Sequence, residues 1–145
     1  MKSEEQIILI VIPEENIRTV LVEALHDYEC PFSYEIVSTT QESRNILSKG
    51  IVQAIIMTKS AALAGDDGMN GLMKTQIELP PTITLIQDGF PDYLYIPGAF
   101  NDWCTMPFSL DELFSRLSFL LKRADKQHGL VLQRKVEGKK QHNLR

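Results

Sequence analysis

Cysteine and histidine are scarce in this sequence, and their scarcity excludes two kinds of site. The chain of 145 residues contains two cysteines, Cys30 and Cys104, and three histidines. The cysteines form no C-x-x-C motif, and no pair of histidines lies near either of them, so neither a zinc site nor a redox-active pair is expected. We expect both thiols to be reduced and structural.

Long apolar runs are also missing. No segment approaches the roughly 18 to 20 apolar residues of a membrane-spanning helix. The N-terminal segment Met1–Gln6 is acidic and polar, unlike a secretory signal. We therefore expect a cytoplasmic protein without a membrane partner, and a chain of this length can bury its own core without disulfides or metals.

Charge is unevenly distributed along the chain. From Lys122 to Arg145 there are eight Lys or Arg and two acidic residues, a net charge of +6, which leaves −10 for the rest of the chain. This shift predicts a globular domain over residues 1–125 and a basic, flexible tail or connector over residues 126–145. A polar, charged composition is typical of a solvated segment; the alternative is contact with nucleic acid or an acidic partner.

Apolar, β-branched runs predict five strands. The run from Gln6 to Ile12 has no polar interruption, as expected of a strand that is buried on both faces of a parallel sheet. Further strands are predicted at residues 34–37, 51–57 and 82–86, and in a short segment before Pro107.

Helical periodicity and capping residues place helices between these strands. Helices are predicted over residues 15–28, after Thr39, over residues 70–78, and from Leu110 onward. Thr39 and Glu42 form a capping box, Gly50 is placed as the C-terminal cap of the same helix, and Ser109 caps the last helix. Residues 58–68 are predicted as a loop, and the Pro- and Gly-rich residues 87–98 leave space for barely one helical turn. The alternation predicts a three-layer αβα sandwich.

Two motifs in this order resemble a known family. Thr105–Leu113 (TMPFSLDEL) resembles the Thr-Lys-Pro-Phe-Ser-x-x-Glu-Leu segment of response-regulator receiver domains, and Met69–Leu72 (MNGL) resembles their Met-Asp-Gly-Leu. The resemblance covers about residues 6–124. It implies a flavodoxin-like α/β fold with a five-stranded parallel sheet in the order 2-1-3-4-5. The fourth helix is expected to be short or missing.

Receiver chemistry requires groups that this sequence lacks. Phosphoryl transfer to an aspartate needs an acidic pair that holds magnesium, a carboxylate nucleophile, a hydroxyl and a lysine. The resemblance aligns these five positions, in that order along the chain, with Ile12, Pro13, Thr58, Ile86 and Met106. We therefore predict a degenerate pseudo-receiver with no catalytic residues, metal or cofactor, and no enzymatic activity.

The loss of these groups leaves open what the five positions form and whether nearby carboxylates replace the metal ligands. The five apolar or neutral positions form either a closed extension of the core or an apolar ligand pocket. Glu14, Glu15, Asp66 and Asp67 lie nearby and could form a shifted carboxylate cage. Acidic side chains on surface loops are usually only solvated, so such a cage would bind a divalent ion weakly.

Aromatic residues are concentrated between Phe90 and Phe119. Five of them suggest an interaction face: Tyr93, Tyr95, Phe100, Trp103 and Phe119. Aromatic anchors with a polar rim are typical of protein interfaces. The alternative is that the rings fill the space of a missing helix. Phe119 lies off the apolar stripe of its helix, so docking or homodimerisation through it is plausible.

Two functions follow from these features. The first is a phosphorylation-independent module that binds a signalling protein, such as a histidine kinase or another two-component protein. The second is a binder of nucleic acid or of an acidic partner through the tail. Residues 126–145 hold too few apolar positions for a helix-turn-helix, so nucleic acid is not expected as a partner except through the tail. The sequence does not identify the partner, the pathway or the oligomeric state.

Overall fold

Strands and helices alternate along the chain. The computed structural model describes residues 6–63, 69–73, 80–86 and 101–137. The elements are, in order, β1 (Ile7–Val11), α1 (Glu15–His26), β2 (Ser33–Val37), α2 (Thr40–Leu47), β3 (Val52–Thr58), α3 (Lys59–Leu63), α4 (Met69–Met73), β4 (Thr82–Ile86), β5 (Asn101–Thr105) and α5 (Leu110–Glu137).

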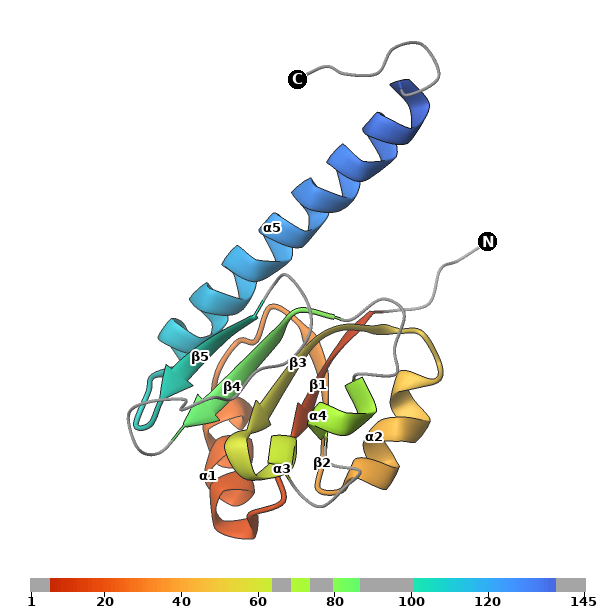
Figure 1. Cartoon of the computed structure of the whole chain (residues 1–145). Helices are drawn as coiled ribbons and strands as arrows, with labels where there is room; N and C mark the ends of the chain where they lie inside the picture. Colours follow the sequence, from red (N-terminus) through yellow and green to blue (C-terminus); the bar gives the residue numbers. More distant parts are fainter. Residues whose placement is uncertain (1–5, 64–68, 74–79, 87–100, 138–145) are drawn as a thin grey trace.

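The five strands form one parallel sheet in the order β2-β1-β3-β4-β5, as predicted (Figure 1). The interior strand β1 pairs with both β2 and β3, and it is buried from Ile8 to Val11. A strand enclosed on both faces needs apolar side chains at successive positions, which explains its uninterrupted β-branched run.

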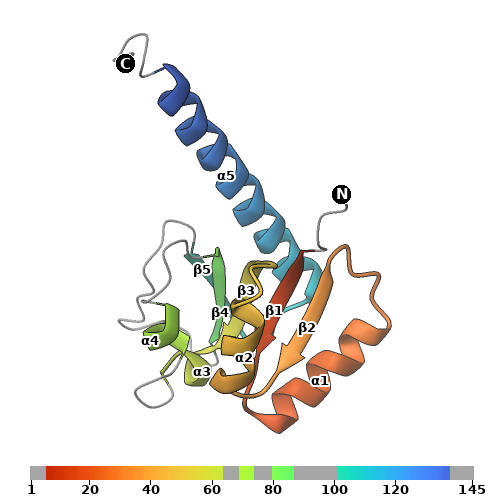
Figure 2. The same cartoon turned by 90° about the vertical axis from the view of Figure 1, so that its right-hand side faces the viewer.

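Helices cover both faces of the sheet and enclose two apolar cores (Figure 2). On one face, α1 and α5 pack residues such as Leu25 and Leu117 against Ile10 and Ile56. On the other face, α2, α3 and α4 pack against the alternate residues of β1 and β3. The flavodoxin-like three-layer sandwich is confirmed.

The caps predicted for two helices are confirmed in their main contacts. The hydroxyl of Thr39 accepts a hydrogen bond from the Glu42 N–H at 3.1 Å, and that of Ser109 accepts one from the Glu112 N–H at 3.0 Å. The prediction for Gly50 was wrong in position, because Ser48 is the C-terminal cap of α2. Gly50 instead closes the following turn with φ at 71°, a conformation that glycine adopts without steric cost.

The connection after β3 differs from its prediction. Residues 59–63 form the short helix α3, where a loop was predicted, and α4 begins at Met69. The prediction of a short or missing fourth helix concerns the segment between β4 and β5. Residues 87–100 of that segment lie outside the described residues.

The last helix passes through the predicted domain boundary. The backbone of α5 is helical to Glu137, twelve residues beyond residue 125. Its C-terminal half projects away from the sheet (Figure 1). Its described core residues lie in the N-terminal half and end at Leu120 and Leu121.

The described helices include none that is long and apolar enough to span a membrane.

Candidate functional site

The carboxyl ends of the parallel strands bring the five aligned positions to one edge of the sheet. Ile12 and Ile86 are almost completely buried there, and Thr58 at the end of β3 is 3% exposed. Pro13 is exposed and Met106 is partly buried. The N–H of Met106 donates to the carbonyl oxygen of Ile86 at 2.7 Å, which joins two of these positions directly. Ile12, Thr58 and Ile86 therefore extend the core, whereas Pro13 and Met106 do not belong to its fully buried part.

A carboxylate that the alignment did not select lies at this edge. The hydroxyl of Thr58 donates to Glu14 Oε1 at 3.1 Å, and the hydroxyl of Ser60 donates to Glu14 Oε2. The two hydroxyl oxygens are 3.0 Å apart. Each carboxylate oxygen of Glu14 therefore has a hydroxyl partner, and the residue in the nucleophile position serves as a hydrogen-bond donor. We call Glu14, Thr58 and Ser60 the polar cluster.

A positive charge lies beside the same loop. Arg18 Nη1 donates to the carbonyl oxygens of Ile12 and Pro13, at 2.8 and 3.2 Å. Arginine stays protonated at all ordinary pH values, so it repels a divalent cation at the end of β1. Among the described residues, no three His, Cys, Asp or Glu side chains gather as a metal site requires. Of the four carboxylates of the alternative cage, Glu14 and Glu15 are described, whereas Asp66 and Asp67 lie outside the described residues, so the cage stays an alternative.

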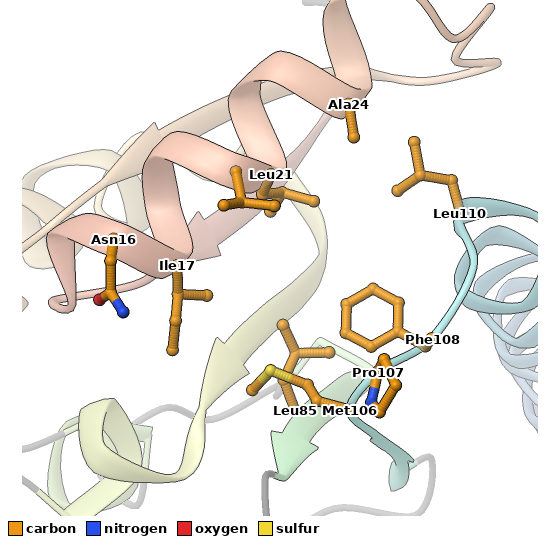
Figure 3. Close-up of a pocket in the computed structure, with 10 residues that line it drawn as sticks. Asn16, Ile17, Leu21, Ala24, Leu85, Met106, Pro107, Phe108 and Leu110 are labelled. Atoms are coloured by element: carbon orange, nitrogen blue, oxygen red, sulfur yellow. The ribbon is translucent and has the colours of Figure 1, made fainter.

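An apolar hollow lies next to this edge, between α1 and the connection from β5 to α5 (Figure 3). It has a volume of about 530 Å³. Its lining includes Ile17, Leu21, Leu85, Met106 and Phe108. The sequence left two alternatives for Ile12, Pro13, Thr58, Ile86 and Met106, a closed extension of the core or an apolar ligand pocket. Of these five residues, only Met106 lines the hollow, because the side chains of Ile12, Thr58 and Ile86 are enclosed in the core.

The predicted aromatic face is only partly described. Tyr93, Tyr95 and Phe100 lie outside the described residues. Trp103 is 49% exposed and Phe119 is 60% exposed.

Trp103 and Phe119 do not belong to one surface. Cys104 packs in the core on the α5 side of the sheet, and neighbouring strand residues point to opposite faces. Trp103 therefore points to the face that α5 does not cover. Phe119 lies on α5 itself, where the guanidinium of Arg123 is 5.8 Å from its ring centre.

Several solved structures that are similar to this chain are receiver domains. The signal receiver domain of an HD domain-containing protein from Pseudomonas fluorescens Pf-5 is 19% identical, with a TM-score of 0.65, and the match covers 85% of this chain and 99% of that chain. A response regulator receiver domain protein from Clostridium thermocellum is 16% identical, with a TM-score of 0.66 and coverage of 84% and 98%.

A third match comes from a complex. It is a chain in a co-crystal of the Saccharomyces cerevisiae histidine phosphotransfer signalling protein Ypd1 with the receiver domain of the response regulator Ssk1. The identity is 20%, the TM-score 0.50, and the coverage 77% of this chain and 86% of that chain. No protein-family model and no curated protein sequence matches the chain significantly. At these identities the likeness establishes the fold.

Proposed function

We propose that this protein is a phosphorylation-independent pseudo-receiver, a non-enzymatic module that binds a protein partner in signal transduction. The receiver fold supports the signalling context. The single observation that carries the proposal is the arrangement at the carboxyl edge. There, Thr58 replaces the carboxylate nucleophile, and the nearest carboxylate, Glu14, is hydrogen-bonded to two hydroxyls.

Charge explains why this edge is unsuited to phosphoryl transfer. The reaction needs cationic groups around the phosphoryl oxygens and a carboxylate to attack. Met106 supplies no charge at the lysine position, and Arg18 is directed to backbone carbonyls. Replacing one group would therefore not restore the reaction, because the nucleophile, the metal ligands and the lysine are all absent from the aligned positions.

Labelling tests the loss of phosphoryl transfer. The chain is incubated with acetyl phosphate and millimolar magnesium, and its intact mass is measured beside a receiver domain that has the acidic pair, the aspartate and the lysine. We expect no gain of a phosphoryl group by this protein and no magnesium-dependent NMR shifts at Thr58. A stoichiometric mass gain, or shifts centred on Thr58, would refute phosphorylation independence.

The partner is proposed to be another signalling protein, such as a histidine kinase or a phosphotransfer protein, or a second copy of this chain. The co-crystal with a histidine phosphotransfer protein supports the first class. Phe119 is the described aromatic residue best suited to docking, because it is 60% exposed on a core-packed helix.

A pair of variants tests docking through Phe119. Phe119→Asp should weaken capture of the partner from native lysate and leave the fold intact. Val22→Asp is the matched control, since Val22 is 46% exposed on α1. If Phe119→Asp keeps the parent's binding, and its mass by light scattering, docking through this residue is wrong.

The salt dependence of binding distinguishes this proposal from binding through the basic tail. Contacts between basic residues and phosphates or acidic groups weaken steeply as salt rises, whereas apolar contacts do not. Capture is therefore measured at low and high salt, with the full chain and with a chain that ends at residue 125. Binding that needs residues 126–145 and disappears at high salt would favour the tail.

A further inference from the structure

We propose that the hollow between α1 and the β5–α5 connection binds a small, uncharged and mostly apolar molecule that carries one hydrogen-bonding group. This inference concerns a site away from Phe119, and it does not rest on the proposed function. It is based on the shape, the lining and the charge of the hollow.

Three parts of the chain line the hollow, which is open to solvent where Val20 is 66% exposed (Figure 3). Ile17 and Leu21 approach it from α1, Leu85 lies at its base on β4, and Met106 and Phe108 approach from the connection after β5. The volume of about 530 Å³ lies within the range of roughly 300–1,000 Å³ typical of small-molecule sites.

The lining determines the chemical class of the ligand. Among the residues that the structure describes, none of those lining the hollow is charged. An ionised ligand would lose its hydration without gaining an ion pair, which is unfavourable in an apolar site. A neutral apolar molecule would instead gain free energy as it and the lining side chains leave water.

Asn16 supplies the one polar side chain of the lining. Its amide can both donate and accept, and it makes no side-chain hydrogen bond to another residue in the described part of the chain. Asn16 lies at the first turn of α1, on the same side of the hollow as Ile17 (Figure 3). A ligand with one N–H or hydroxyl group could therefore bind the amide while its apolar part faces Met106 and Phe108.

The test uses indole, a neutral apolar probe with one N–H donor, and follows methyl NMR signals of the full chain. We expect saturable shifts at Ile17, Leu85 and Met106. Indole-3-carboxylate, which adds a negative charge to the same ring, should bind at least about tenfold more weakly, because the lining offers no cation.

A variant that fills part of the hollow tests whether indole binds there. Ala24→Leu adds carbon atoms at the rim of the hollow in a helix that tolerates leucine well. It should weaken indole binding at least about tenfold and preserve the dispersion of the spectrum. Thr19→Leu is the matched control, because Thr19 is exposed on α1 but does not line the hollow. It should bind indole like the parent.

Several outcomes would overturn the proposal. These are the absence of saturable shifts, equal weakening by Ala24→Leu and Thr19→Leu, and equal affinity for the carboxylate. Shifts at the lining residues that depend on protein concentration without indole would overturn it as well, because they would assign the hollow to a second copy.

Discussion

Thr58 and Thr84 are about equally buried, but among the described residues their hydroxyls differ in hydrogen bonding. The two residues are 3% and 4% exposed on neighbouring strands. Thr58 donates to Glu14, whereas Thr84 makes no side-chain hydrogen bond to any described residue. Thr58→Val should therefore lower the free energy of unfolding by about 1 kcal/mol, as measured by urea denaturation.

Thr84→Val is the control for this measurement. It removes a buried hydroxyl that has no described partner, so it should be neutral or stabilising. Equal losses in the two variants would mean that the polar cluster contributes nothing beyond packing.

The two cysteines should differ in reactivity. Cys104 is 1% exposed, and burial raises the pKa of its thiol to about 11, while Cys30 is partly exposed. Only the thiolate is nucleophilic. At pH 8 the native protein should therefore gain one iodoacetamide adduct, at Cys30, and a second only after denaturation. Native alkylation of both residues at one rate would contradict the burial of Cys104.

The sequence identified the residues at the five aligned positions but not the groups around them. The resemblance placed Thr58 and Met106 correctly at one edge of the sheet. The contact between Glu14 and Thr58 joins residues 44 positions apart, and no periodicity indicates which rotamers meet across that distance. The side chain of Arg18 likewise reaches backbone carbonyls, which carry no signal in the sequence.

At the scale of single elements, the N-terminus of α2 is held by a carboxylate that titrates, that of Glu42. Hydrogen bonds from the Ser38 N–H, and then from the Thr39 N–H, lower the pKa of Glu42 in the folded state below its ordinary value. A depressed folded-state pKa stabilises the fold above the unfolded value, and this contribution is lost as pH falls through the folded-state pKa. Glu42→Gln should therefore be less stable than the parent at pH 7, with a difference that shrinks below about pH 4.

Thermal unfolding at pH 7 and pH 3 measures this difference. Glu23→Gln controls for the loss of one charge, because Glu23 is exposed on α1 and makes no hydrogen bond to a described residue. A stability difference for Glu42→Gln that is the same at both pH values would show that the carboxylate does not act as a cap.

The elements that the sequence predicted well are those with long patterns. The uninterrupted apolar run of β1 indicates a buried strand, and the apolar stripe of α5 extends over enough residues to show a helical period. The short helix α3 was missed because five residues rich in alanine show no clear periodicity, and because small residues also suit a loop. Its Ala61 and Ala62 are buried against the sheet, so tertiary packing determines the conformation.

For the molecule as a whole, α5 has two parts: an N-terminal part that packs in the core of the domain and a C-terminal part that extends beyond it. The described core contacts of α5 end at Leu120 and Leu121, although its backbone stays helical to Glu137. A chain that ends at residue 125 should keep nearly the full chain's urea midpoint. A chain that ends at Ser118 loses Leu120, which is 2% exposed, and should be less stable by more than about 3 kcal/mol or fail to fold. If the chain ending at residue 125 lost as much stability as the shorter one, residues 126–145 would belong to the folded domain and the boundary near residue 125 would be wrong.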